Sequence, residues 1–267
     1  MNRRKAAKMM LAGSVLAILS ACGSSTAGGS YPTYRYRLTV EVDTPEGLRT
    51  GSSVIEVTTR LAGPYSIPNP GQVINSSRGE AVTVDLGRRG ILFALLRSEM
   101  AEGWTHNLMF LLAPPVPRSV NRGLPNSSDL DFDMRMKATL ALTGARVIPR
   151  DFAEFPESWR EPGNPPTGWP MMVRFRNLAD PKSVEKINPD DLSASFGDGV
   201  KLRRITAERT DDPVTSGILA RLPWLAHTQG SLTKQPRDRK TGQLVPLIDT
   251  HLSVQLTNGD FIKGISK

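Results

Sequence analysis

Strict alternation of apolar and polar residues over positions 34–42 is the feature that most limits how this chain can fold. Successive side chains of a strand point to opposite faces, so the pattern assigns five residues to one face: Tyr34, Tyr36, Leu38, Val40 and Val42. Residues 44–47 (Thr-Pro-Glu-Gly) predict a turn, and residues 53–58 predict the returning strand. The first folded part of the chain is therefore expected to be an antiparallel pair.

Further strand candidates follow, each rich in β-branched or other apolar residues: residues 81–86, 91–96, 171–176, 200–208, 252–256 and 261–265. The sequence between the first two, residues 87–90, predicts a hairpin turn. Asn258-Gly259 predicts another hairpin between the last two, because Asn-Gly is typical of two-residue hairpin turns. Residues 107–112 and 140–148 fit either a buried strand or a short helix.

Helix signals are few. Asn188-Pro189-Asp190-Asp191 is typical of a helix start, and Gly197 and Gly199 predict that this helix is brief. Residues 63–71 and 149–170 are rich in proline and glycine and predict long irregular loops. We therefore expect a mainly β fold, with a β-rich α+β fold as the alternative. It should contain antiparallel strands and hairpins, one or two short helices and long Pro/Gly-rich loops.

The N-terminus has the parts of an export signal. Four basic residues come first: Arg3, Arg4, Lys5 and Lys8. Residues 9–19 then form an apolar run that is too short to span a bilayer, because a spanning helix needs about 20 apolar residues. The run ends in Leu19-Ser20-Ala21-Cys22.

This tetrapeptide resembles the lipobox of bacterial lipoproteins: an aliphatic residue, two small residues and a cysteine. The resemblance implies cleavage between Ala21 and Cys22 and a thioether-linked diacylglycerol, with fatty acyl chains such as palmitate, on the Cys22 sulfur. The alternative is an N-terminal transmembrane anchor with a chance cysteine. Gly23 follows the cysteine; in Gram-negative lipoproteins an aspartate there commonly retains the protein in the inner membrane. Its absence favours the outer membrane.

The chain divides accordingly into a signal peptide (1–21), a lipidated cysteine with a Gly/Ser linker (22–33), a β-rich N-terminal part (34–148), a Pro-rich crossing (149–170) and a β-rich C-terminal part (171–267). We expect the two β-rich parts to pack as one body. The small, polar linker residues behave as a flexible coil whose r.m.s. length is about 15–20 Å.

Charge and cysteine content exclude several classes of function. Removing the four basic residues of the signal from 34 leaves 30, against 26 acidic residues, so the mature net charge is +4. This modest charge and an envelope location argue against a nucleic-acid partner. Cys22 is the single cysteine. Lipidation would use it, so neither a disulfide nor thiol catalysis is expected.

Asp129, Asp131 and Asp133 are the first candidates for a ligand site, because alternate carboxylates suit a hard cation such as calcium. An EF-hand loop needs glycine and glutamate where this chain has Met134 and Leu140, so that motif is excluded. The favoured interpretation is a strand with an acidic face, and no metal site is assigned.

The histidines are His106, His227 and His251, and none stands in a zinc motif. On a strand, Asp249 and His251 would share a face, as a general base and its orienting carboxylate require. No nucleophile elbow, phosphate-binding loop or dinucleotide-binding turn accompanies them. We therefore assign no catalytic residue and no cofactor.

Two surface features complete the candidates. Residues 234–240 form a basic loop, which fits either a solvated loop or a contact with anionic lipid phosphates. Trp159, Trp169 and Trp224 lie in proline-rich surroundings, where aromatic residues line a ligand groove or, as we favour here, close one end of a β core.

The body also resembles a recurrent, uncharacterised family of bacterial proteins, in residues 78–82, 92–96, 180–184, 188–192, 195–197 and 222–224. No activity comes with this resemblance, so it assigns no functional residue.

Two functions from different classes follow. The first is a lipid-anchored envelope protein that binds or assembles without catalysis, with the membrane as its first partner and a protein of the envelope as a further one. The second is a lipid-anchored hydrolase of envelope material, suggested by Asp249 and His251 alone.

Overall fold

The computed structural model describes residues 30–63, 73–99, 101–114, 127–151 and 168–264, and for residues 127–131 it describes the backbone alone. The predictions for the signal peptide, Cys22 and Trp159 fall outside these residues. So do those for most of the linker, most of the Pro-rich crossing and nearly all of the 63–71 loop.

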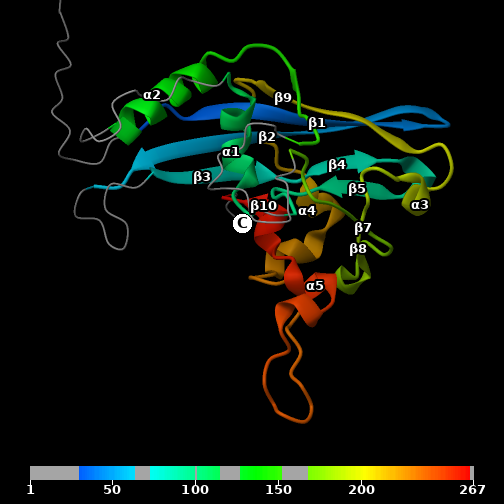
Figure 1. The fold of residues 1–267 in the computed structure, drawn as a ribbon. Helices are drawn as coiled ribbons and strands as arrows, with labels where there is room; N and C mark the ends of the chain where they lie inside the picture. The colour runs from blue at the N-terminus through cyan, green and yellow to red at the C-terminus, as the bar shows by residue number, and fades with distance from the viewer. Residues whose placement is uncertain (1–29, 64–72, 100, 115–126, 152–167, 265–267) are drawn as a thin grey trace, which may run out of the picture.

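Within the described residues, ten strands form two antiparallel sheets, which confirms the mainly β fold (Figure 1). The large sheet has the order β10-β3-β2-β1-β9-β6. Its strands are β1 (Tyr34–Thr44), β2 (Gly47–Leu61), β3 (Val73–Glu80), β6 (Arg146–Val147), β9 (Lys201–Arg209) and β10 (Ile262–Lys263). The small sheet has the order β4-β5-β7-β8, with β4 (Val82–Asp85), β5 (Ile91–Ala94), β7 (Met172–Phe175) and β8 (Val184–Lys186).

The β1–β2 hairpin forms as the alternation predicts. Its register runs from Tyr34 opposite Val57 to Thr44 opposite Gly47. The five residues assigned to one face are all buried, and their neighbours are partly exposed. β1 also pairs with β9, so the large sheet joins strands from both sides of the Pro-rich crossing.

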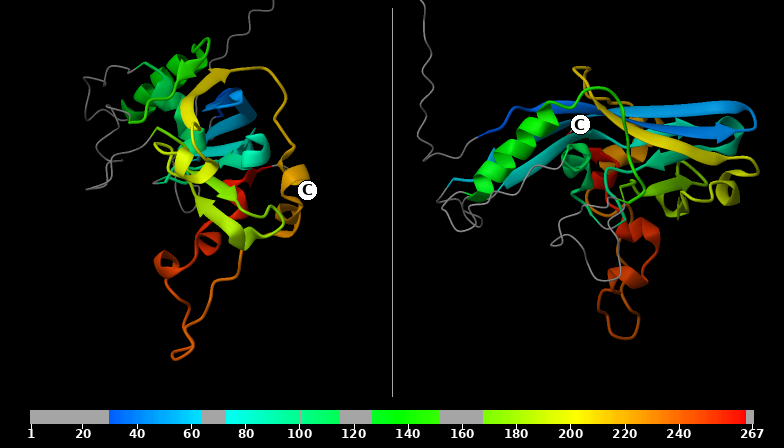
Figure 2. Two further views of the ribbon diagram at one scale, coloured as in Figure 1. Left: turned by 90° about the vertical axis from the view of Figure 1, so that its right-hand side faces the viewer. Right: turned by 45° about the horizontal axis from the view of Figure 1, so that its top comes forward.

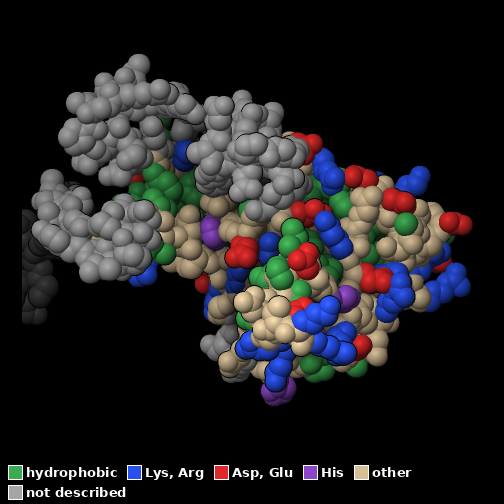
Figure 3. Space-filling view, turned by 60° about the horizontal axis from the view of Figure 1, so that its bottom comes forward, with side chains coloured by type: hydrophobic (Ala, Val, Ile, Leu, Met, Phe, Trp, Pro, Cys, Tyr) green, Lys and Arg blue, Asp and Glu red, His purple; other side chains and the backbone are tan. Residues whose placement is uncertain are grey.

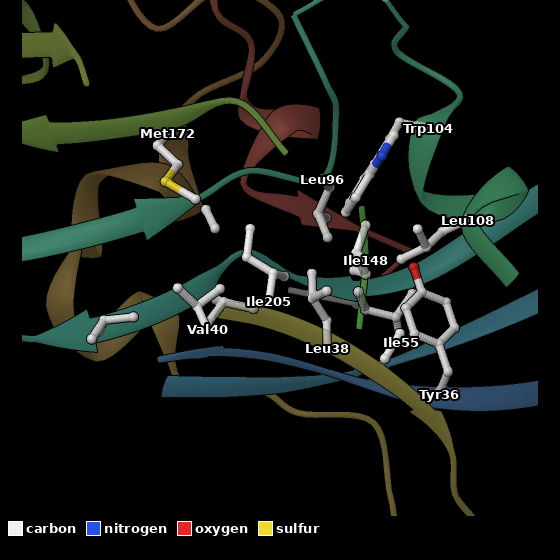
Figure 4. Close-up of a cluster of buried hydrophobic side chains, with 14 of the residues drawn as sticks. Tyr36, Leu38, Val40, Ile55, Leu96, Trp104, Leu108, Ile148, Met172 and Ile205 are labelled. Atoms are coloured by element: carbon white, nitrogen blue, oxygen red, sulfur yellow. The ribbon is translucent and has the colours of Figure 1, made fainter. Parts of the chain in front are cut away.

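The core consists of two hydrophobic clusters that meet at β5. All four β5 residues are buried; Leu92 and Ala94 belong to the first cluster, whereas Ile91 and Phe93 belong to the second. Figure 4 shows the first cluster, in which β1 side chains pack beneath Trp104. The small sheet is therefore a middle layer, with the large sheet on one side and the C-terminal helices on the other (Figures 1 and 2).

The two sheets approach closely at Gly51 of β2. A Cβ atom there would lie 2.2 Å from the carbonyl oxygen of Thr83 in β4. Real Cβ atoms do not approach an oxygen so closely, so this position needs glycine.

Helices are more numerous than the sequence predicts. The described residues hold α1 (Trp104–Leu112), α2 (Ser127–Leu140), α3 (Ser193–Phe196), α4 (Ile218–Arg221) and α5 (Leu252–Gln255). They also hold the 3₁₀ turns η1 (Gly87–Arg89), η3 (Pro181–Ser183), η4 (Pro223–His227), η5 (Leu247–Asp249) and η6 (Asn258–Asp260). The ambiguous segment 107–112 is helical, and segment 140–148 holds the end of α2 and the short β6.

The strand predicted across Asp129, Asp131 and Asp133 is wrong, because this segment is helical and belongs to α2. Apolar residues alternate there, but the helix buries Met136 and Thr139 and leaves Met134 43% exposed. Burial of one helix face, on which residues recur every three or four positions, therefore determines the structure of this segment in place of the apolar–polar alternation.

The C-terminal hairpin prediction is also wrong. Residues 252–255 form one turn of helix, and Asn258-Gly259 opens the 3₁₀ turn η6. The side chain of Asp260 is 4% exposed and accepts a hydrogen bond from the backbone nitrogen of Thr257 at 2.7 Å, as in a capping box. β10 instead pairs with β3.

The helix predicted at Asn188 begins later, as α3. The Asn188 side chain accepts from the Asp190 nitrogen and forms a local turn. Asp191 accepts from the Ala194 nitrogen, and the helix stops at Gly197, as predicted.

Candidate functional site

Residues of α1, α2 and the start of β3 line an apolar groove. Figures 1 and 2 show where these three elements lie beside the large sheet. The volume of the groove is about 350 Å³, at the lower end of the range for small-molecule pockets. The lining residues are Val73, Asn75, Asn107, Phe110, Leu111, Phe132 and Arg135.

Helical spacing positions most of this lining. α1 buries Trp104 and Leu108, one turn apart, in the first core cluster. Asn107 and Leu111, also one turn apart, are only partly buried and line the groove.

Aromatic rings form the inner wall of the groove. Phe110 is 6% exposed, and its ring centroid lies 5.4 Å from that of Phe132 in α2. At the opposite limit, Val73 is 37% exposed. The groove therefore runs from a buried aromatic wall to a rim open to solvent.

Among the described residues that line the groove, Arg135 is the one that carries a charge, and it is half-buried. Its guanidinium carbon lies 6.0 Å from the Phe110 ring centroid, and its Nη2 donates to the Phe110 carbonyl oxygen at a long 3.5 Å. Among the described side chains, no carboxylate lies within ion-pair distance of it. The groove thus combines an apolar wall with a cation that pairs with no carboxylate among the described side chains.

The start of the described chain is fixed beside this groove. The Tyr31 ring lies edge-on to Phe132 at 5.0 Å, and its hydroxyl donates to Asp133 at 2.6 Å. The Tyr31 nitrogen donates to the Thr59 carbonyl oxygen at 2.9 Å. Ser30 is eight residues after Cys22, a distance of about 26–29 Å when fully extended.

Asp249 and His251 do not share a strand face, so that prediction is wrong. Asp249 ends η5, and His251 caps α5: its Nδ1 accepts from the Ser253 nitrogen at 3.2 Å. The Ser253 hydroxyl lies 3.0 Å from the same Nδ1 and 2.8 Å from the hydroxyl of Thr233. Among the described residues, the His251 ring forms no hydrogen bond with the Asp249 carboxylate.

This histidine–serine pair is a helix cap in form. Ser253 is 1% exposed, so a substrate carbonyl has no route to its hydroxyl in this conformation. A catalytic pair needs a reachable nucleophile and a third group that orients the base. The described residues supply neither at His251.

The acidic cluster does not form a described cation site. Asp133 accepts the Tyr31 hydroxyl, and the side chains of Asp129 and Asp131 lie outside the described residues. Within those residues, no group of three or more His, Cys, Asp or Glu side chains is arranged to hold a metal.

The other two histidines lie in separate elements: His106 in α1 and His227 in η4. Burial and, to a smaller extent, the nearby Lys263 ammonium together lower the pKa of His106 to about 4.

The basic loop belongs to a projecting segment, residues 234–250, at the bottom of Figure 1. Asp238 folds its tip by accepting from the backbone nitrogens of Lys240 and Thr241, which keeps the pKa of its carboxyl below its usual value. The segment also exposes three large apolar side chains: Leu244 (51%), Leu247 (52%) and Ile248 (86%). Figure 3 shows basic and hydrophobic side chains side by side on this face.

Of the three tryptophans in proline-rich surroundings, Trp169 and Trp224 pack against the core, as favoured from the sequence. The Trp169 indole nitrogen donates to the Ile148 carbonyl oxygen at 3.0 Å, and that of Trp224 donates to the Leu178 carbonyl oxygen at 2.7 Å. Trp169 adjoins the first cluster and Trp224 the second.

Comparisons with known proteins add no assignment: no protein-family model, curated protein or solved structure matches this chain. The resemblance of the body to uncharacterised bacterial proteins stays a prediction. In the described part of the chain, each helix is too short or too polar to cross a membrane.

Proposed function

We propose that this chain is a lipid-anchored envelope protein, held by lipid on Cys22, whose β body binds an apolar ligand without catalysis. The observation that carries the binding role is the groove between α1, α2 and β3, with its buried Phe110 wall. Gly23 after the lipidated cysteine favours the outer membrane over the inner membrane.

The position of the groove supports the link between anchoring and binding. Tyr31 contacts Phe132, which itself lines the groove, so a tether running from Cys22 joins the body at the binding site. The eight residues from Cys22 to Ser30 limit the distance between the lipid attachment point and the start of the described chain to about 26–29 Å.

The lipid anchor is tested by replacing the modified sulfur, Cys22→Ser, and following labelled palmitate and membrane fractionation. The wild-type chain should carry label and sediment with membranes, and the variant should lose both properties. Unchanged labelling and membrane retention in the variant would refute the anchor.

Binding is tested on the chain starting at Gly23, which contains every described contact between Ser30 and Gly264 and should unfold cooperatively. Nile red, an uncharged dye, should bind saturably. Leu111→Trp should fill the groove and weaken binding by about 1.4 kcal/mol or more, which is at least tenfold. Leu48→Trp is the matched control, since Leu48 is 52% exposed and lies outside the lining. Equal binding by both variants would refute the groove as the site.

The hydrolase remains the second candidate because the Ser253 hydroxyl lies 3.0 Å from His251 Nδ1. The burial of Ser253 argues against it. Turnover of ester or amide substrates by the wild-type protein, lost in Ser253→Ala while folding is retained, would establish the hydrolase in place of the binding protein.

A further inference from the structure

The guanidinium of Arg135, which has no carboxylate partner among the described side chains, indicates the charge of the ligand that the groove would bind. Arginine stays protonated at any physiological pH, so Arg135 brings a permanent positive charge to a half-buried position beside Phe110. A charge that is partly withdrawn from water is stabilised by a partner of opposite sign. The described side chains provide no such partner, so an anionic ligand group would complete the site.

Asparagine amides add polar groups on the same lining. The Asn75 Oδ1 accepts from the Thr59 hydroxyl at 2.7 Å, and among the described residues its Nδ2 donates no hydrogen bond. Asn107 donates through Nδ2 to the Gly103 carbonyl oxygen at 3.2 Å. Asn75 therefore retains a free donor for an oxygen anion.

The remaining described residues of the lining are apolar, and the groove is small. Val73, Phe110, Leu111 and Phe132 present no polar side-chain atom, and the volume of about 350 Å³ suits one hydrocarbon chain rather than two. A ligand with a single hydrocarbon chain and one anionic end matches a groove that has apolar walls and one positive charge, on Arg135.

We propose that the groove binds a fatty acid, with its hydrocarbon chain along Phe110, Leu111 and Phe132 and its carboxylate on Arg135. This assignment rests on the proposed binding function and adds the chemical class of the ligand. The tether joins the body beside Phe132, and the membrane that would hold its lipid also supplies fatty acids.

The test measures binding of three twelve-carbon probes to the chain starting at Gly23: laurate, dodecyl phosphate and the uncharged dodecanol. Laurate should bind about tenfold to a hundredfold more tightly than dodecanol, as expected for a charge-assisted hydrogen bond. Arg135→Gln should remove that preference by weakening laurate binding about tenfold or more, to near the affinity for dodecanol. Arg88→Gln removes the same charge from an exposed arginine outside the lining and should change nothing.

Each outcome separates the two proposals. Equal binding of laurate and dodecanol, with no effect of Arg135→Gln, would overturn the fatty-acid assignment and leave the apolar groove in place. Tighter binding of dodecyl phosphate than of laurate would overturn the carboxylate in favour of a phosphate-bearing lipid. If none of the three probes binds, and Leu111→Trp does not change the binding of Nile red, the binding function itself would be overturned.

Discussion

Glu80 offers the sharpest test of how the C-terminal helices are attached to the sheets. This carboxylate is 5% exposed at the end of β3, and its Oε2 accepts hydrogen bonds from the backbone nitrogens of Gly217 and Ile218 at 2.7 and 2.9 Å. These are N–H groups at the start of α4 that have no partner within the helix. Ile218 is itself buried in the second hydrophobic cluster.

The magnitude follows from the two bonds. Hydrogen bonds to a charged group contribute about 1.5–3 kcal/mol each, and a buried donor left without a partner costs about 1–3 kcal/mol. The bonds share one oxygen and are not additive, so Glu80→Ala should lower the free energy of unfolding by about 2–4 kcal/mol. Glu80→Gln keeps one acceptor oxygen and should lose about 1–2 kcal/mol.

Urea unfolding followed by tryptophan fluorescence measures these losses, with unchanged m-values as the sign that only stability has moved. Glu46→Gln is the control: Glu46 also binds two groups, the guanidiniums of Arg88 and Arg89, but on an exposed turn. Its effect should be much smaller than that of Glu80→Gln. A Glu80→Ala protein as stable as the wild type would refute the attachment of α4 through this carboxylate.

Three further predictions rest on single features of the fold. The unfolded pKa of His106 is near 6.5 and the folded pKa is about 4, so the unfolded state binds more protons between these values. Stability should fall by about 1–3 kcal/mol as pH drops from 6.5 to 4, and His106→Asn should flatten this slope in pH-dependent unfolding. Gly51→Ala should destabilise by about 1–3 kcal/mol or more in thermal unfolding, since its Cβ would meet the Thr83 carbonyl oxygen; a neutral effect would contradict the close approach of the sheets. Replacing residues 238–243 by Asn-Gly should change stability by less than about 0.5 kcal/mol in urea unfolding, because the projecting tip bonds to itself; a larger loss would show that the tip supports the body.

Sequence patterns predicted the strands well where burial is one-sided or complete. β1 alternates because one of its faces packs on the core, and β5 is continuous because each of its faces meets a different hydrophobic cluster. The predictions failed where a local pattern competed with side-chain capping or tertiary burial. At Asn258-Gly259, the buried capping carboxylate of Asp260 favours a 3₁₀ turn over the predicted hairpin turn. In the segment before Met136, burial of one helix face favours a helix over the predicted strand.

The groove left only one local signal in the sequence. Its lining comes from β3, α1 and α2, and residues as far apart as Asn75 and Arg135 meet only because α1 packs on both other elements. Arg135 three residues after Phe132 was the one available hint, since this spacing places both on one side of a helix. The hint was lost because the segment was interpreted as a strand.

Placement beside the tether changes what affinity the groove needs. A binding site linked to a surface by a short flexible chain experiences an effective concentration in the millimolar range for groups on that surface. If lipid on Cys22 holds the linker to the bilayer, the eight residues before Ser30 keep Ser30, which precedes the groove contact Tyr31, within about 26–29 Å of that attachment point. A weak site then suffices, and the rim at Val73, 37% exposed, leaves a route for the ligand to leave. An open groove with a single cation is therefore better suited to exchange with a membrane than to long-term storage, which would require a closed cavity.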